Sequence, residues 1–155
     1  MDAQVLGLAD AKALRAVCDE AGIVLRTDTD PLAGAWPERP GLPSAPVYEH
    51  PAAFAPVSRA DKLARVRADL AAQGASHHLV SSVDDIAWIT NLRGSDVQYN
   101  PVFLAHLLIG PDSVQLFVGA GKVDAALAAT LAADGITVAD YAQAPAALAA
   151  LPGHA

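Results

Sequence analysis

The chain has 155 residues, of which 53% are hydrophobic, and this is enough for one packed domain with a short additional segment. Its 10 basic and 17 acidic residues give a formal net charge of -7, which argues against nucleic acid and anionic membranes as partners. The longest strongly apolar run, 101–110, is far shorter than the roughly 20 residues that a membrane helix needs. The single cysteine, Cys18, and the lack of a signal-peptide pattern predict a cytoplasmic protein.

Two elements are predicted before a proline-rich stretch. Residues 8–21 are rich in helix formers and Gly22 is a natural stop, so this segment predicts a helix. The sequence IVLR at 23–26 predicts a short strand. The many prolines of 27–57 should exclude regular strand pairing and favour an extended linker.

The remaining residues, 58–155, alternate between helical and strand patterns that predict one domain. Ser58 followed by Asp61 resembles a capping box, which marks the start of a helix. In chain order the patterns predict a helix at 58–74, a strand at 76–82, a brief helix capped by Ser82 and Asp85 through Trp88, strands at 102–109 and 113–119, a helix at 122–133, a strand at 136–140 and a short helix at 144–151.

The strands at 102–109 and 113–119 have different patterns. The first is almost continuously apolar, as expected of a strand covered on both faces. The second alternates between apolar and polar residues, so we expect an antiparallel hairpin whose second strand is less buried. With the neighbouring helices, this order predicts an α/β layer structure with a mixed sheet.

Much of the polar chemistry lies in DDIAWITNLRGSDVQYNPV, residues 84–102. A loop at the edge of a sheet is a usual place for binding groups, and Gly94 allows a tight turn there. Arg93 offers a planar fork of donors that suits a carboxylate. Either Asp96 supplies that carboxylate, in an ion pair that fixes the loop, or Arg93 faces a ligand.

The aromatic residues of this segment have structural interpretations as well. Trp88 follows Ile86 in an amphipathic turn, which favours a place in the core, although the ring edge could line a pocket. Tyr99, Asn100 and Pro101 predict a turn that leads into the next strand, because proline cannot donate to a ladder and fits its first residue.

Clusters of catalytic or metal-binding groups are scarce. His77 and His78 are adjacent, so on a strand they face opposite sides and cannot both bind one metal ion. His106 lies in an apolar strand and is interpreted as a satisfied core histidine. The sequence GAGK at 119–122 lacks the spacing and the Ser or Thr of a phosphate-binding loop. We therefore predict neither catalytic residues nor a metal site in this chain.

The stretch DDIAWITNLRGSDVQYNPVFLAHLLI, residues 84–109, resembles the signature of the middle domain of three-domain Xaa-Pro aminopeptidases, or aminopeptidase P, in the creatinase/prolidase superfamily. The resemblance extends to WPERPGLPSAPVYEH at 36–50, SRADKLARVRADL at 58–70 and VQLFVGAGKV at 114–123. It implies a creatinase/prolidase N-terminal domain fold, with a mixed β-sheet flanked by helices. This agrees with the α/β class that the patterns predict.

The resemblance also implies three parts: residues 1–26 as the end of a preceding domain, 27–57 as a linker and 58–155 as the middle domain. Without its parent sheet, the strand at 23–26 should be frayed or paired with another chain. The family removes an N-terminal residue that precedes proline and uses two divalent metal ions, usually manganese, in a catalytic domain whose motifs do not appear here. The expected partners are that catalytic domain, a peptide with proline in second position and further copies in a homo-oligomer such as a dimer.

By this resemblance the chain is expected to be a noncatalytic fragment that walls the substrate cleft and aids assembly. Its sequence Trp88-Ile89-Thr90-Asn91 is similar to an aromatic, aliphatic, Thr, Gly order in the prolidase relatives, with Asn91 in place of glycine. The candidates to face substrate are Trp88, Asn91, Arg93 and Asp96. The alternative is a free-standing protein-interaction or small-ligand-binding module of the same fold without peptidase activity.

Overall fold

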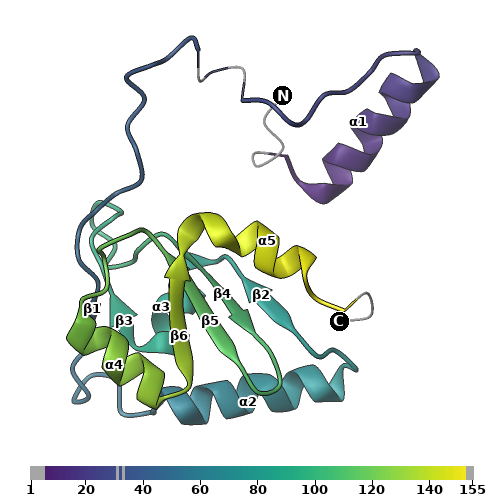
Figure 1. Ribbon diagram of the computed structural model, residues 1–155. Helices are drawn as coiled ribbons and strands as arrows, with labels where there is room; N and C mark the ends of the chain where they lie inside the picture. The colour runs from purple at the N-terminus through teal and green to yellow at the C-terminus, as the bar shows by residue number, and fades with distance from the viewer. Residues whose placement is uncertain (1–5, 31, 33, 153–155) are drawn as a thin grey trace. The chain divides into compact units, whose positions relative to one another are not determined.

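The computed structural model describes residues 6–30, 32 and 34–152 (Figure 1). The chain divides into two compact units, Met1–Gly41 and Leu42–Ala155. Among the helices of the described residues, none combines the length and apolar character needed to cross a membrane.

The first unit contains the predicted N-terminal helix, α1 (Leu8–Glu20), which is confirmed. The chain leaves this helix through Gly22, whose φ of 67° lies in the left-handed region that favours glycine. The strand predicted at 23–26 is wrong, because these residues form no strand in the described structure. The side chain of Val24 is 85% exposed.

The second unit contains all other helices and strands of the described residues. In chain order they are β1 (Tyr48–Glu49), α2 (Arg59–Ala72), β2 (His78–Val80), α3 (Val83–Thr90), β3 (Leu92–Arg93), β4 (Ala105–Ile109), β5 (Val114–Val118), α4 (Ala125–Ala133), β6 (Ile136–Asp140), the 3-10 turn η2 (Tyr141–Gln143) and α5 (Ala144–Ala149). This order confirms the predicted α/β class.

The main sheet has the strand order β2-β4-β5-β6 (Figure 1). Strands β4 and β5 form the predicted antiparallel hairpin, with Leu107 opposite Leu116. β2 is antiparallel to β4, whereas β6 is parallel to β5 and follows it through α4. The sheet is therefore mixed, as predicted.

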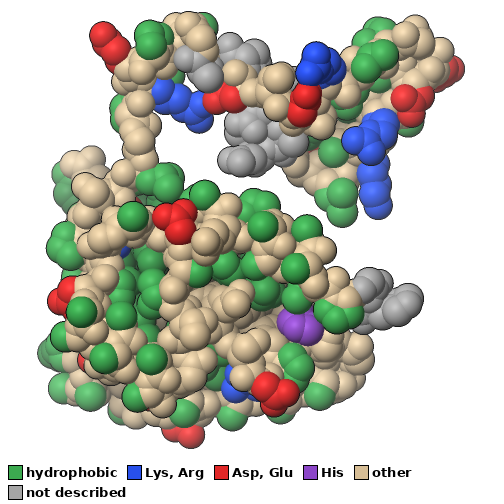
Figure 2. Space-filling view, viewed as in Figure 1, with side chains coloured by type: hydrophobic (Ala, Val, Ile, Leu, Met, Phe, Trp, Pro, Cys, Tyr) green, Lys and Arg blue, Asp and Glu red, His purple; other side chains and the backbone are tan. Residues whose placement is uncertain are grey.

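Alternation along the strands divides the apolar side chains between two faces of this sheet. Leu107 and Leu116 belong to the larger core, which includes Leu63 of α2, Ile86 of α3 and Leu131 of α4. The opposite face carries a smaller core that consists of Leu108, Phe117 and Ala144, the last from α5. Among the described elements, three helices thus cover one face, and α5 with the neighbouring η2 covers the other. On the side of the second unit that is in view in Figure 2, hydrophobic side chains are numerous and charged ones are few.

The expectation that the second hairpin strand is less buried is wrong. β5 has the same burial pattern as β4, and Leu116 and Phe117 are almost fully buried. The reason is that β6 adds to the outer edge of β5 and makes it an interior strand. The alternation in its sequence comes from Gln115, which is only half-buried.

Strand pairing also occurs within the proline-rich stretch, which the prolines were expected to exclude. β1 pairs antiparallel with β3, with Tyr48 opposite Arg93 and Glu49 opposite Leu92. Val47 is buried in the larger core. The prolines leave this short window free, so the end of the stretch packs with the domain.

The starts of the helices show how far local sequence determines them. Ser58 caps α2: its Oγ accepts a hydrogen bond from the backbone N–H of Asp61 and donates to Asp61 Oδ2, so the predicted helix start is confirmed. Ser82 is the N-cap of α3, but its side chain makes no capping hydrogen bond. α4 begins at Ala125, three residues later than predicted, because the side chain of Asp124 caps the helix and accepts from the N–H of Leu127.

Candidate functional site

The end of α3 places the predicted site residues. The helix stops at Asn91, whose φ of 53° is left-handed. Glycine adopts this conformation freely, and asparagine tolerates it better than most other residues. This geometry gives a physical reason why an asparagine can stand where the prolidase order has glycine.

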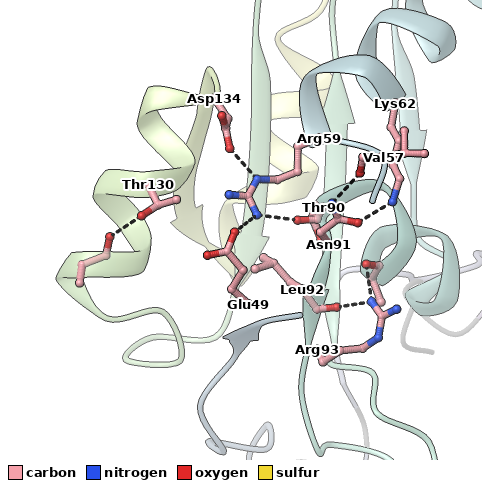
Figure 3. Close-up of polar contacts among 12 residues, drawn as sticks. Glu49, Val57, Arg59, Lys62, Thr90, Asn91, Leu92, Arg93, Thr130 and Asp134 are labelled. Carbon is pink, nitrogen blue, oxygen red and sulfur yellow. Dashed lines mark hydrogen bonds and ion pairs between the residues drawn. The ribbon is translucent and has the colours of Figure 1, made fainter. Parts of the chain in front are cut away.

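The side chain of Asn91 is buried and connects α3 to the start of α2 (Figure 3). Its Oδ1 accepts a hydrogen bond from Lys62 Nζ at 2.5 Å, and its Nδ2 donates to the carbonyl of Val57 at 2.9 Å. Lys62 Nζ also donates to the carbonyl of Trp88 at 2.6 Å and lies 4.4 Å from the centroid of the Trp88 ring. Lys62 thus ties together the last turn of α3.

Trp88 is not the core anchor that its position after Ile86 predicted. Ile86 and Ile89 are buried in the larger core, whereas Trp88 is 48% exposed. Its ring lines a cavity of about 330 Å³ between α2, β2 and α3. The pocket-lining interpretation of Trp88 is therefore confirmed.

Arg93 and Asp96 do not pair with each other, so the predicted ion pair is wrong. Arg93 Nη1 donates to the carbonyls of Ala87 at 2.7 Å and Leu92 at 2.8 Å, which fixes the guanidinium against the end of α3 (Figure 3). Among the described residues, the other two guanidinium nitrogens have no hydrogen-bond partner. Arg93 is half-buried and keeps donors for a ligand.

Asp96 points into the protein and pairs with Lys122. Its Oδ1 lies 2.5 Å from Lys122 Nζ, and the two side chains are 0% and 1% exposed. Its Oδ2 accepts from the N–H of Leu104, and Lys122 also donates to the carbonyl of Pro43. This pair joins the loop after β3, the chain before α4 and the proline-rich stretch.

Lys122 is a residue that sequence reasoning missed. It was considered only as the lysine of GAGK, for which no phosphate-binding pattern exists. Asp96 is 26 positions away in the sequence, so no local spacing connects the two. The one available signal is a lysine between apolar residues, Val118 and Val123, which requires a partner if it is buried.

Arg59 is a second missed residue. It is buried at the start of α2, where Nε donates to Asp134 at 2.7 Å and Nη1 donates to Glu49 at 2.8 Å (Figure 3). Nη1 also donates to the carbonyl of Thr90 at 3.2 Å. Arg59 and its two carboxylates line a second cavity of about 490 Å³, which Asn91 also borders. The guanidinium holds β1, α3 and the end of α4 around α2.

The turn before β4 is confirmed. The N–H of Asn100 donates to the carbonyl of Val97 at 3.2 Å, and the N–H of Val102 donates to the carbonyl of Asn100 at 2.8 Å. Tyr99 stands at the tip with a φ of 64° and 97% exposure.

His106 lies on β4 on the α5 side of the sheet. Its Nδ1 forms a 2.8 Å hydrogen bond with the hydroxyl of Ser81, and its ring stacks on Tyr141 at a centroid distance of 4.8 Å. The histidine is half-buried and hydrogen-bonded, and burial lowers its pKa below 6.5. Within residues 6–30, 32 and 34–152, no group of three or more His, Cys, Asp or Glu side chains could hold a metal ion.

Comparison with curated proteins shows similarity to fungal peptidases. The chain is 33% identical over 127 residues to a probable Xaa-Pro aminopeptidase P of Paracoccidioides lutzii, which covers 81% of this chain and 21% of the relative. The corresponding protein of Talaromyces marneffei is 32% identical over 136 residues, which is 86% of this chain and 21% of the relative. That of Aspergillus niger is 39% identical over 97 residues, which is 63% of this chain and 16% of the relative. The chain therefore spans about a fifth of their length.

A solved structure has the same fold. The crystal structure of X-prolyl aminopeptidase from Caenorhabditis elegans, described as a cytosolic enzyme with a di-nuclear active site, matches with a TM-score of 0.83 at 20% identity. The match covers 95% of this chain and 24% of the worm enzyme. The family model of the creatinase/prolidase N-terminal domain matches residues 38–155. The chain thus belongs to the creatinase/prolidase N-terminal domain family, as the sequence of residues 84–109 predicted.

Proposed function

We propose that this chain is a noncatalytic part of a metal-dependent Xaa-Pro aminopeptidase, the class of enzyme that removes an N-terminal residue before proline. The observation that carries the proposal is the similarity to probable Xaa-Pro aminopeptidases P. It covers most of this chain and about a fifth of the length of each relative. In the proposal the chain walls the substrate cleft, aids assembly into a homo-oligomer and contacts the catalytic domain of its parent. It acts in the cytoplasm, as the worm enzyme is described to do.

The proposed wall is the surface at the end of α3. Trp88 offers a half-exposed ring and Arg93 offers guanidinium donors, so these two side chains are the ones proposed to meet the peptide. Arg93 would bind a peptide carboxylate or carbonyl oxygen. Asn91 and Asp96 are proposed to act through their neighbours, because both side chains already have hydrogen-bond partners inside the domain.

The two divalent metal ions of the proposed reaction do not fit the described residues. Glu49, Asp96 and Asp134 each pair with a buried cation rather than with one another, and among the described residues no group of three or more His, Cys, Asp or Glu side chains could hold a metal ion. In the proposal the ions, manganese by resemblance, are held by the catalytic domain of the parent. No step of the chemistry is assigned to this chain.

The test is Xaa-Pro peptide hydrolysis by the full-length parent with Arg93→Ala. If Arg93 binds a peptide oxygen, kcat/KM should fall by about tenfold or more, as expected for the loss of a charge-assisted hydrogen bond of 1.5–3 kcal/mol. Arg65→Ala removes an exposed arginine from α2 and is the matched control. Unchanged kinetics and assembly with Arg93→Ala would remove this residue from the proposal.

A second measurement tests the noncatalytic assignment. The purified chain should neither hydrolyse a proline-containing dipeptide nor bind manganese at micromolar concentration. Either activity in a contaminant-free preparation would contradict the proposal, and the chain would then carry its own site.

A further inference from the structure

The cavity beside Trp88 lies at an edge of the main sheet. Its walls are the α2 face of Val66, Asp69, Leu70 and Gln73, the β2 residues His78 and Val80, and the α3 residues Asp85, Trp88 and Ile89. On α2 these positions are three or four residues apart, so they form one continuous face. On β2 the two residues alternate and share the side of the sheet that the helices cover.

The inner part of this cavity is apolar. Val80 and Ile89 are buried members of the larger core, and Val66 packs against that core from α2. Trp88 forms one side of the opening with a half-exposed ring. A cavity of about 330 Å³ with this lining suits the aliphatic or aromatic part of one side chain.

The opening of the cavity is acidic. Asp69 and Asp85 are exposed, and among the described residues neither carboxylate has an ion-pair partner. Lys62 lies on the Trp88 ring, but its donors go to the Trp88 carbonyl and to Asn91. Two unpaired carboxylates beside an aromatic ring attract a cation, and a guanidinium can both pair with a carboxylate and stack on a ring.

The strand that floors the cavity has an unpaired edge. β2 pairs with β4 on one side and is the terminal strand of the sheet in the described structure (Figure 1). Its second edge offers backbone N–H and C=O groups to an added strand. In such an addition, main-chain hydrogen bonds supply affinity, and alternate side chains of the added strand enter pockets beside it.

We propose that this cavity is a docking site for an extended peptide segment that carries an arginine. The segment adds to the free edge of β2 and places its arginine between α2 and α3. There the aliphatic stem packs on Val66 and Val80, and the guanidinium pairs with Asp69 and Asp85 against Trp88. The site shares Trp88 with the proposed substrate wall, but Asp69, Asp85 and the edge of β2 have no part in the proposed peptidase function.

Trp88 fluorescence provides the measurement. Trp36, the second tryptophan, lies in the other unit and is removed with Trp36→Phe, so that the remaining signal reports the cavity. The probe is the blocked peptide Ac-Val-Thr-Arg-Thr-Val-NH2, and the matched peptide has norleucine in place of arginine. We expect saturable quenching by the arginine peptide and at least tenfold weaker binding of the norleucine peptide.

Charge removal tests the opening of the cavity. The double variant Asp69→Asn with Asp85→Asn should weaken binding of the arginine peptide by at least tenfold. The control Asp19→Asn with Glu20→Gln removes the same charge from exposed positions of α1 and should leave binding unchanged. Circular dichroism should show that both variants remain folded.

The blocked residue Ac-Arg-NHMe tests the strand edge, because it can reach the carboxylates but cannot pair along β2. It should bind at least tenfold more weakly than the pentapeptide, and equal affinity would overturn the extended-peptide assignment. The docking site itself is overturned if the pentapeptide shows no saturable binding, if the norleucine peptide binds equally well, or if the Asp69 and Asp85 double variant binds as well as the control.

Discussion

Two buried lysines hold two neighbouring parts of the site in different ways. Lys122 is 2% exposed and pairs with Asp96, so its charge is neutralised inside the loop after β3. Lys62 is 3% exposed and has no carboxylate among its partners, which are the carbonyl of Trp88, the amide oxygen of Asn91 and the Trp88 ring. One region is fixed by an ion pair, and the other is fixed by dipoles and a π-system.

The difference shows in the pKa of Lys62. Burial lowers it below 10.5, because the charged form loses water, and the guanidinium of Arg93 lowers it further by repulsion. The charge of Lys62, which no carboxylate neutralises, therefore lowers the stability of the fold at the end of α3, where the proposed ligand-facing residues lie. The ion pair of Lys122 instead stabilises a loop that has no exposed charge of its own. These two arrangements predict different responses to substitution.

The largest effect is expected for Asp96→Asn, which leaves the charge of Lys122 buried without a counterion. Breaking a buried ion pair from one side typically costs about 3–5 kcal/mol, and we expect the free energy of unfolding to fall by this amount. Urea unfolding followed by circular dichroism measures it. Asp112→Asn, in the exposed turn before β5, is the control and should change stability by less than about 0.5 kcal/mol. A loss as small as that of the control would contradict the ion pair.

A smaller loss is expected for Lys62→Met. Methionine keeps much of the aliphatic stem and leaves no unpaired charge, but the Asn91 Oδ1 and Trp88 carbonyl lose a donor. We expect a destabilisation of about 1–3 kcal/mol. Arg65→Met, at an exposed position on the same helix, is the matched control for the change of residue type. If Lys62→Met costs as much as Asp96→Asn, the contrast between the two lysines is wrong.

The left-handed backbone of Asn91 gives a third test, in which two substitutions are compared. Asn91→Gly and Asn91→Ala both lose the hydrogen bonds to Lys62 and Val57. Alanine also has a Cβ at a φ of 53°, where an L-residue is strained by about 1–2 kcal/mol, so the glycine variant should be the more stable by about 1 kcal/mol. Thermal and urea unfolding measure the order. Equal stability of the two variants would show that the backbone conformation imposes no strain.

The smallest effect is a pH dependence. An unfolded lysine keeps its proton up to its ordinary pKa of 10.5, whereas folded Lys62 releases it at lower pH. Below 10.5 the unfolded state therefore binds more protons, and stability contributed through Lys62 rises as pH increases through the lowered pKa. Urea unfolding of the wild type and Lys62→Met, from neutral pH up to 10.5, should show this rise only in the wild type. A fall instead would mean that the site favours the charged lysine.

Local sequence predicted those parts of the fold that depend on local interactions. The N-cap Ser58 started α2 at the predicted place, and the turn at 110–112 joined the predicted hairpin. The family, too, could be identified from the run at 84–109. These features depend on residues that are close together in the sequence.

The prediction failed where distant residues meet. The burial of β5 depends on its pairing with β6, and Val114 lies opposite Ile136 only after the chain has passed through α4. The Asp96 ion pair depends on Lys122, and the cap of α3 depends on Lys62, which is 29 positions before Asn91. Spacing arguments cannot identify such partners, because the fold and not the sequence distance brings them together.

The parallel pairing of β5 with β6 has a consequence for synthesis on the ribosome. Until residues 136–140 have left the exit tunnel, β5 is the outer strand of a nascent sheet, and its unpaired backbone edge lies beside Leu116 and Phe117. Such an edge can recruit a strand from another nascent chain. Pairing with β6 therefore covers an edge of β5 to which another chain could otherwise add a strand.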